Sequence, residues 1–319
     1  MTQALSTSSA APGQHDLPGV DPSAANRILA RWMVPLEAVS AALMVGIVGM
    51  LFGGVVARYL FGRPITWIDE AVSFAFIWVA MLGAVLAMHR NEHLRLTMFV
   101  DRMPARLQGL VHAFALAAMA AFLIGLIGPA IEHVESEWIV TSPALDIPAG
   151  ARVAAIAAGL ILMLAIVLVY SVRTVSKVNL AIAVAGTAAM VALCTWLAPQ
   201  FAQLGLLNIL IFLTGLVALC LVAGVPIAFC FGCGVMAFLA FSSHVPLVVI
   251  VGRIDEGMAN LVLVSVPIFV LLGCVLDATG MGKAIVDLLA SLIGHVKAGM
   301  SYVLLGSLFI VSGISGSKV

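Results

Sequence analysis

One apolar run reads AGARVAAIAAGLILMLAIVLVY at residues 149–170, and Arg152 is its one charged side chain. A helix needs about 20 consecutive apolar residues to cross the hydrocarbon core of a bilayer, which is about 30 Å thick. The run lacks the alternation of apolar and polar residues that is typical of a strand in a membrane β-barrel. It therefore predicts a membrane-spanning α-helix.

Similar runs follow one another along most of the chain. With 63% hydrophobic and only 9% charged residues, the 319-residue chain has too few charges to cover a water-soluble surface. The sequence therefore predicts an all-α polytopic membrane protein. Seven spans are predicted: 34–57, 71–88, 110–131, 149–170, 179–198, 204–223 and 225–241. Further apolar helices, some of them short or interrupted for a crossing, are predicted near 261–277, 284–296 and 299–314.

The N-terminal stretch and the basic residues bear on topology. Residues 1–26 are rich in Ser, Ala, Pro and Gly without the pattern of a signal peptide, so we predict a disordered tail. Lys and Arg gather before the first span, between the second and third, and after the fourth, whereas the loop 132–148 is acidic. The positive-inside rule then places the N-terminus in the cytoplasm, although Arg58 and Arg63 fall on the outer side.

A short polar segment, 171–178, divides the chain into two membrane modules. We predict a four-helix module at residues 27–176, a linking transmembrane helix at 177–200 and a second module at 201–319. The zero net charge gives no reason to expect a nucleic-acid partner. Membrane lipids are expected around both modules.

Three residues at the start of the second span are candidates for a specific role. Asp69 and Glu70 would occupy its first turn, where carboxylates complement the helix dipole. Trp67 is suited to a membrane interface. Two interpretations stay open: a helix start with an aromatic anchor, or a specific contact between helices or subunits.

Two segments of the second module could bind a solute or an ion. Pro267 interrupts the apolar run 261–276, which indicates either a kinked packing helix or carbonyls freed to line a cavity. Ser315, Gly316 and Ser317 follow a strongly apolar run, so the helix could stop and turn inside the membrane. Hydroxyl and carbonyl oxygens suit Na⁺, and broken helices form ion sites in transporters. The alternative is a Gly/Ser loop at the membrane surface.

Catalytic constellations are not evident. The sequence shows no Ser/His/Asp cluster and no chain of intramembrane carboxylates, so neither an enzyme nor a proton relay is indicated. The five cysteines are best interpreted as apolar packing residues, and no organic cofactor or zinc site is expected. Solute transport is therefore the favoured class of function.

The motifs together resemble the fused membrane subunit of the TRAP transporters, the tripartite ATP-independent periplasmic transporters. Residues 34–170 are similar to the small, Q-type component, through Arg58-Tyr59, Gly62-Arg63-Pro64, Trp67, Asp69-Glu70, Trp78, Gly83 and His93. Residues 204–319 are similar to the start of the large, M-type component. Its motifs are Gly224-Val225-Pro226-Ile227-Ala228, Ser265-Val266-Pro267-Ile268-Phe269, Gly273, Gly280 and Ser315-Gly316-Ser317.

The resemblance implies a permease of the bacterial inner membrane that is driven by a Na⁺ gradient. A periplasmic substrate-binding protein would deliver an organic anion, often a carboxylate, and the M-type part would move it by an elevator motion against a fixed Q-type part. The turn at Ser315, Gly316 and Ser317 would be the tip of a re-entrant hairpin near the sodium and substrate sites, with Pro267 a weaker candidate nearby.

The likeness covers the start of the M-type component, which in the family runs for several hundred residues. The sequence ends at Val319, directly after the serine turn, so the expectation is a fragment of a permease with an incomplete transport module. The alternative function is a non-transporting membrane scaffold or an inactive fragment. The sequence does not identify the substrate, the Na⁺ stoichiometry or the oligomeric state.

Overall fold

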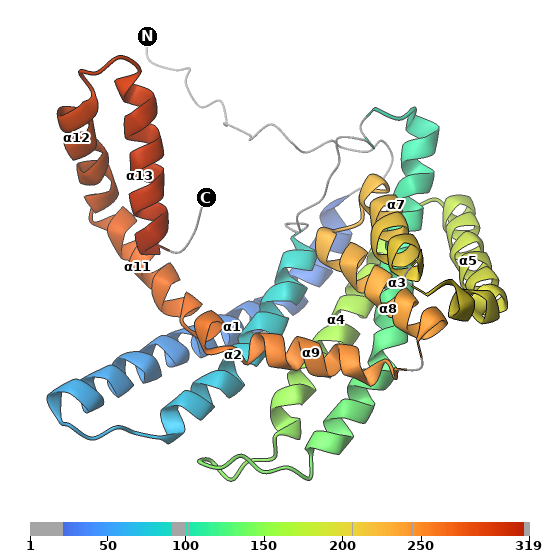
Figure 1. The fold of residues 1–319 in the computed structure, drawn as a ribbon, viewed down its shortest axis with the longest axis horizontal. Helices are drawn as coiled ribbons and strands as arrows, with labels where there is room; N and C mark the ends of the chain where they lie inside the picture. The colour runs from blue at the N-terminus through green and yellow to red at the C-terminus, as the bar shows by residue number, and fades with distance from the viewer. Residues whose placement is uncertain (1–21, 91–99, 101, 206, 244, 316–319) are drawn as a thin grey trace.

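The computed structural model describes residues 22–90, 100, 102–205, 207–243 and 245–315. Within these residues the protein is helical, and its extended pairing is limited to an isolated antiparallel bridge between Thr141 and Pro148 (Figure 1). The all-α prediction is confirmed. The predicted tail at 1–26 extends too far, because the first helix begins at Pro22. Proline fits a helix start, since the N–H that it lacks would have no partner there.

Within the described residues, five helices are long and apolar enough to cross a membrane, and the bent pair 248–258 and 262–278 would be a sixth if it forms one span. They match the five spans predicted between residues 34 and 198 and extend beyond them, except that α4 begins one residue after the predicted start at 149. Their bounds are α1 Pro22–Leu60, α2 Trp67–His89, α3 Ala105–Glu137, α4 Gly150–Thr174 and α5 Lys177–Leu204.

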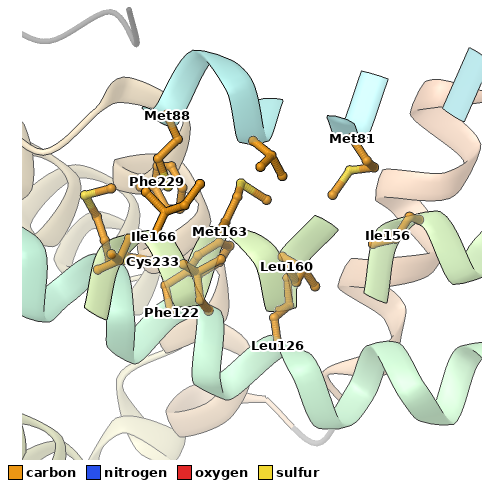
Figure 2. Close-up of a cluster of buried hydrophobic side chains, with 14 of the residues drawn as sticks. Met81, Met88, Phe122, Leu126, Ile156, Leu160, Met163, Ile166, Phe229 and Cys233 are labelled. Atoms are coloured by element: carbon orange, nitrogen blue, oxygen red, sulfur yellow. The ribbon is translucent and has the colours of Figure 1, made fainter. Parts of the chain in front are cut away.

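A large apolar core lies between α2, α3 and α4. Figure 2 shows side chains of α2 (Met81), α3 (Leu126) and α4 (Leu160) directed toward one another in this core. Gly159 on α4 permits a close approach, because an added Cβ would overlap the side chain of Met81. Helix α1 packs on α2, and α5 packs on α3. The long apolar runs of the sequence thus form a helix bundle with a common interior.

The next elements are shorter than predicted. Residues 207–222 form α6 Leu207–Ile209, the π-helix η1 Leu210–Leu216 and α7 Val217–Val222, and α8 Ile227–Ser242 follows. Neither apolar helix reaches the length needed for a separate crossing, which corrects the spans predicted at 204–223 and 225–241. The chain reverses at Gly224, which has a φ of +73° that glycine adopts without steric strain. Pro226 then precedes α8.

Helix α9, Val248–Met258, runs across the bundle and contacts α2, α3 and α4 (Figure 1). Ile250 and Val251 are buried in the same core as the side chains of α2, α3 and α4. Phe229 and Cys233 of α8 join this core as well (Figure 2). The interior of the first module therefore continues without a break into the second.

The chain then turns away from the bundle. Helix α10, Leu261–Val264, leads into α11, Val266–Ala278. The segment 262–278 that contains them is bent by 54° relative to the segment 248–258 of α9. Helices α12, Met281–Ile293, and α13, Gly299–Ser315, form an antiparallel pair that packs on α11. This three-helix group, α11–α13, stands to one side of the bundle in Figure 1.

Candidate functional site

A buried ion pair joins α9 to the bundle. Arg152, in the first turn of α4, donates from Nη2 to Oδ2 of Asp255 on α9 at 2.7 Å. The Asp255 side chain is 9% exposed and that of Arg152 is 23% exposed. Charges at this depth are costly unless they are paired, so the contact specifies where α9 lies.

His133 of α3 extends this polar cluster. A Cβ placed on Gly252, one turn before Asp255, would lie 3.9 Å from His133 Cε1, so α9 passes directly over the imidazole. Nε2 of His133, Oδ1 of Asp255 and Nε of Arg152 are buried, and no hydrogen-bond partner for them is present among the described residues. The three side chains bring α3, α4 and α9 together at one point. We name them the anchor cluster.

Sequence reasoning missed the anchor cluster. Its signal was present in the α9 sequence VVIVGRIDEGM, where Asp255 lies on an otherwise apolar face while Arg253 and Glu256 pair on the exposed face at 2.7 Å. An acid on an apolar helix face calls for a basic partner elsewhere. The identity of that partner depends on tertiary packing, which the pattern does not contain.

The three candidate residues at the start of α2, Trp67, Asp69 and Glu70, have different surroundings in the structure. Oε2 of Glu70 accepts hydrogen bonds from the backbone N–H groups of Ala144 and Leu145, each at 2.9 Å. Glu70 therefore holds the loop between α3 and α4, and both interpretations of its role stay predictions. Trp67 is 44% exposed at the first position of α2. Asp69 is exposed beside it, and a role of either residue in contacts with a partner stays a prediction.

Pro267 is buried at the second position of α11. The break in the apolar run lies just before it at Ser265, whose hydroxyl donates to the Val262 carbonyl at 2.6 Å. A proline in the first helical turn costs no hydrogen bond. Pro267 thus starts a new helix after an interruption, and a role in solute binding stays a prediction.

The predicted sodium turn lies at the edge of what the structure describes. Helix α13 ends at Ser315, and its side chain, like Gly316 and Ser317, lies outside the described residues. The described part of α13 packs on α11 and α12. Among the described residues, no group of three or more His, Cys, Asp or Glu side chains could hold a metal ion.

Comparisons with protein families divide the chain in two. Residues 47–178 match the family described as the DctQ component of the tripartite ATP-independent periplasmic transporters. Residues 213–319 match the family described as their DctM component. The two matches correspond to the four-helix bundle and to the elements that follow α5.

Curated relatives contain both components in one chain. The isethionate TRAP transporter permease protein DctMQ of Oleidesulfovibrio alaskensis is 23% identical over 79% of this chain and 39% of its own length. The sialic acid TRAP transporter permease protein SiaT of Haemophilus influenzae is 20% identical over 89% of this chain and 48% of its own length. A small permease protein, DctQ of Vibrio cholerae, named for C4-dicarboxylates, is 33% identical over 29% of this chain. The chain thus spans less than half the length of the two fused relatives.

The fold and these matches define the class of the protein. It is a multi-pass helical membrane permease and not an enzyme. The chain belongs to the TRAP transporter permeases, in the form that fuses the small and large components.

Proposed function

We propose that this chain supplies the membrane permease part of a Na⁺-coupled secondary transporter that imports an organic anion, with a carboxylate as the first choice. The permease would lie in the bacterial inner membrane with its N-terminus in the cytoplasm. It would receive its solute from a periplasmic substrate-binding protein. Na⁺ would bind near the turn at residues 315–317.

The substrates named for its relatives support the anionic class. Isethionate, sialic acid and C4-dicarboxylates are all acids that are ionised at neutral pH, and they appear in the names of three separate relatives. A solute of this class needs a carrier to cross a hydrocarbon layer, and its accumulation against a gradient needs an energy source. A sodium gradient would supply that energy without a nucleotide.

The observation that carries the proposal is the unequal attachment of the two parts of the fold. Helices α2, α3, α4, α8 and α9 share one core, and the anchor cluster joins three of them. The α11–α13 group contacts the bundle mainly through α1, and the short α10 contacts α2. A transporter that works by an elevator motion needs a rigid body and a second body that can slide against it.

The test is uptake by the complete permease that carries these residues. We would reconstitute it in liposomes with its substrate-binding protein and measure accumulation of radiolabelled dicarboxylate, sialic acid or isethionate. Accumulation should require an inward Na⁺ gradient, and it should disappear when K⁺ replaces Na⁺ or when the binding protein is omitted.

Two outcomes would contradict the proposal. Equal uptake in Na⁺ and in K⁺ would remove sodium coupling, and uptake that is independent of the binding protein would remove that partner. The control is the Arg253→Ala variant, which changes only an exposed ion pair and should transport at the wild-type rate.

A further inference from the structure

A cavity of about 660 Å³ lies where the linking helix α5 meets α3, η1 and α8. Phe122 of α3, Met190 of α5, Phe212 of η1 and Met236 of α8 each form part of its wall. Its volume is in the range of sites that hold small molecules. Its wall takes residues from both matched regions and from the helix α5 that connects them.

The cavity offers almost nothing to a polar ligand. The Thr187 hydroxyl lines it but donates to the Ala183 carbonyl at 2.8 Å. The Cys233 thiol also lines it and donates to the Ala118 carbonyl at 3.8 Å. The rest of the wall is mainly Ala, Leu, Ile, Val, Phe and Met. Water is stable in a cavity when two to four polar partners surround it, so this wall favours hydrocarbon.

The cavity is open at the depth of the lipid chains. Val191, Ile211 and Leu219 belong to its wall, yet they are 44%, 41% and 51% exposed, so the space reaches the outer surface of the fold. Thr187 comes ten residues after Lys177, the first residue of α5. At 1.5 Å per residue this is about 15 Å, or half of a hydrocarbon core of about 30 Å.

Backbone geometry creates the space. Ala183 on α5 packs tightly against Ala113 and Ala117 near the start of α3. Beyond this contact the wall contains the π-helical turn of η1, and such turns widen a helix locally. The side chains of the wall leave this space open, so hydrocarbon from the surrounding bilayer can enter it.

We propose that this cavity binds one acyl chain of a membrane phospholipid, wedged between the bundle and the elements that follow α5. Arg173 at the end of α4 and Lys177 at the start of α5 are exposed about one half-bilayer away from Thr187. They can meet the phosphate of the lipid whose tail fills the cavity. The proposal does not depend on sodium coupling or on the identity of the solute.

The first test needs no substitution. The complete permease is placed in nanodiscs that contain phosphatidylglycerol with a diazirine near the end of one acyl chain, and the sample is illuminated and digested. Mass spectrometry should find adducts concentrated on the peptides that carry Met190 and Met236. Adducts spread evenly over exposed α5 residues such as Val184 and Leu193, with none on Met236, would overturn the proposal.

The second test fills the cavity from two of the helices that line it. Ala121→Phe on α3 and Ala237→Phe on α8 should each reduce the Met190 and Met236 adducts to the level of an unilluminated sample. Ala185→Phe adds the same ring on an exposed face of α5 outside the cavity and should leave the adducts unchanged.

Equal adducts in all three variants would overturn the proposal. Circular dichroism and the elution volume report whether each variant is folded. If neither filled variant folds, the wild-type adduct map decides the question by itself.

Discussion

Arg152 and Asp255 illustrate how one pair of residues can determine the position of a whole helix. Asp255 is almost fully buried, so removing its partner leaves a charge without compensation. We expect Arg152→Ala to lower the free energy of unfolding by about 3–5 kcal/mol, the range for breaking a buried pair. Thermal unfolding of the purified protein in detergent, followed by intrinsic fluorescence, measures the change.

The exposed pair of Arg253 and Glu256 on the same helix provides the matched control. Their side chains are 75% and 67% exposed, and an exposed pair contributes about 0–1 kcal/mol. Arg253→Ala should therefore unfold at nearly the wild-type temperature. If Arg152→Ala and Arg253→Ala unfold at the same temperature, the anchor cluster does not position α9.

The serine hydroxyls at the end of α13 allow a second test at the residue scale. If Ser315 and Ser317 contribute oxygens to Na⁺, then Ser315→Ala and Ser317→Ala in the complete permease should raise the Na⁺ concentration needed for half-maximal uptake. The amount of protein in the membrane should stay constant. Ser291→Ala on α12 serves as control, because this exposed hydroxyl donates to the Leu288 carbonyl within its own helix. An unchanged sodium dependence in both variants would remove the ion site.

The role of a residue could be predicted from the sequence only where its neighbours along the chain determine that role. Glu70 stands in the first turn of α2, and the helix dipole alone accounts for an acid there. Its bonds to Ala144 and Leu145 join residues more than seventy positions apart, so no local pattern contains them. The pair of Arg152 and Asp255 is separated by 103 positions and is unpredictable for the same reason.

At the scale of elements, glycines on two helices should respond to alanine with opposite signs. An added Cβ on Gly234 of α8 would lie 2.6 Å from Val217 Cγ2 and 3.0 Å from the Phe212 backbone carbonyl. Overpacking of this kind costs about 1–3 kcal/mol, so Gly234→Ala should destabilise the contact of α8 with η1. Gly83 of α2 has nothing within 4 Å of its Cβ position. Gly83→Ala should stabilise by up to about 1 kcal/mol through helix propensity.

Thermal unfolding of the two glycine variants measures this difference directly. The expected order of unfolding temperature is Gly83→Ala, then wild type, then Gly234→Ala. A Gly234→Ala variant as stable as Gly83→Ala would mean that η1 and α8 do not pack as closely as the structure places them.

The sequence predicted long elements well and short ones less well. Spans such as 110–131 and 149–170 stand out because length and apolar content suffice to define a crossing. The regions 204–223 and 225–241 have the same apolar character, yet they form helices that are too short to cross. Hydropathy alone does not register the positive φ at Gly224 or the π-helical turn of η1. Hydropathy does not register the bend before α11 either, and the sequence indicated only a possible kink at Pro267.

For the whole molecule, the structural division differs from the division into families. The DctM match begins at residue 213, but α8 and α9 belong to the core formed by α2, α3 and α4. The chain leaves this core instead near Asn260, whose side chain caps α10 by accepting from the Val262 N–H at 3.0 Å. Part of the large component thus packs into the core of the small one, whereas α11–α13 contact it mainly through α1.

Hydrogen exchange should report this division in the complete permease. Helix α4 has ten buried residues, whereas α12 has none, and local stability follows the number of buried apolar contacts. Amides of α12 and α13 should exchange faster than those of α4 in nanodiscs. Adding Na⁺ should slow exchange in α13 without changing α4, because an ion stabilises the state that binds it. Equal addition of K⁺ is the control. If α4 and α12 exchanged at the same rate, or if Na⁺ slowed both equally, the molecule would be one rigid body and the boundary at Asn260 would carry no motion.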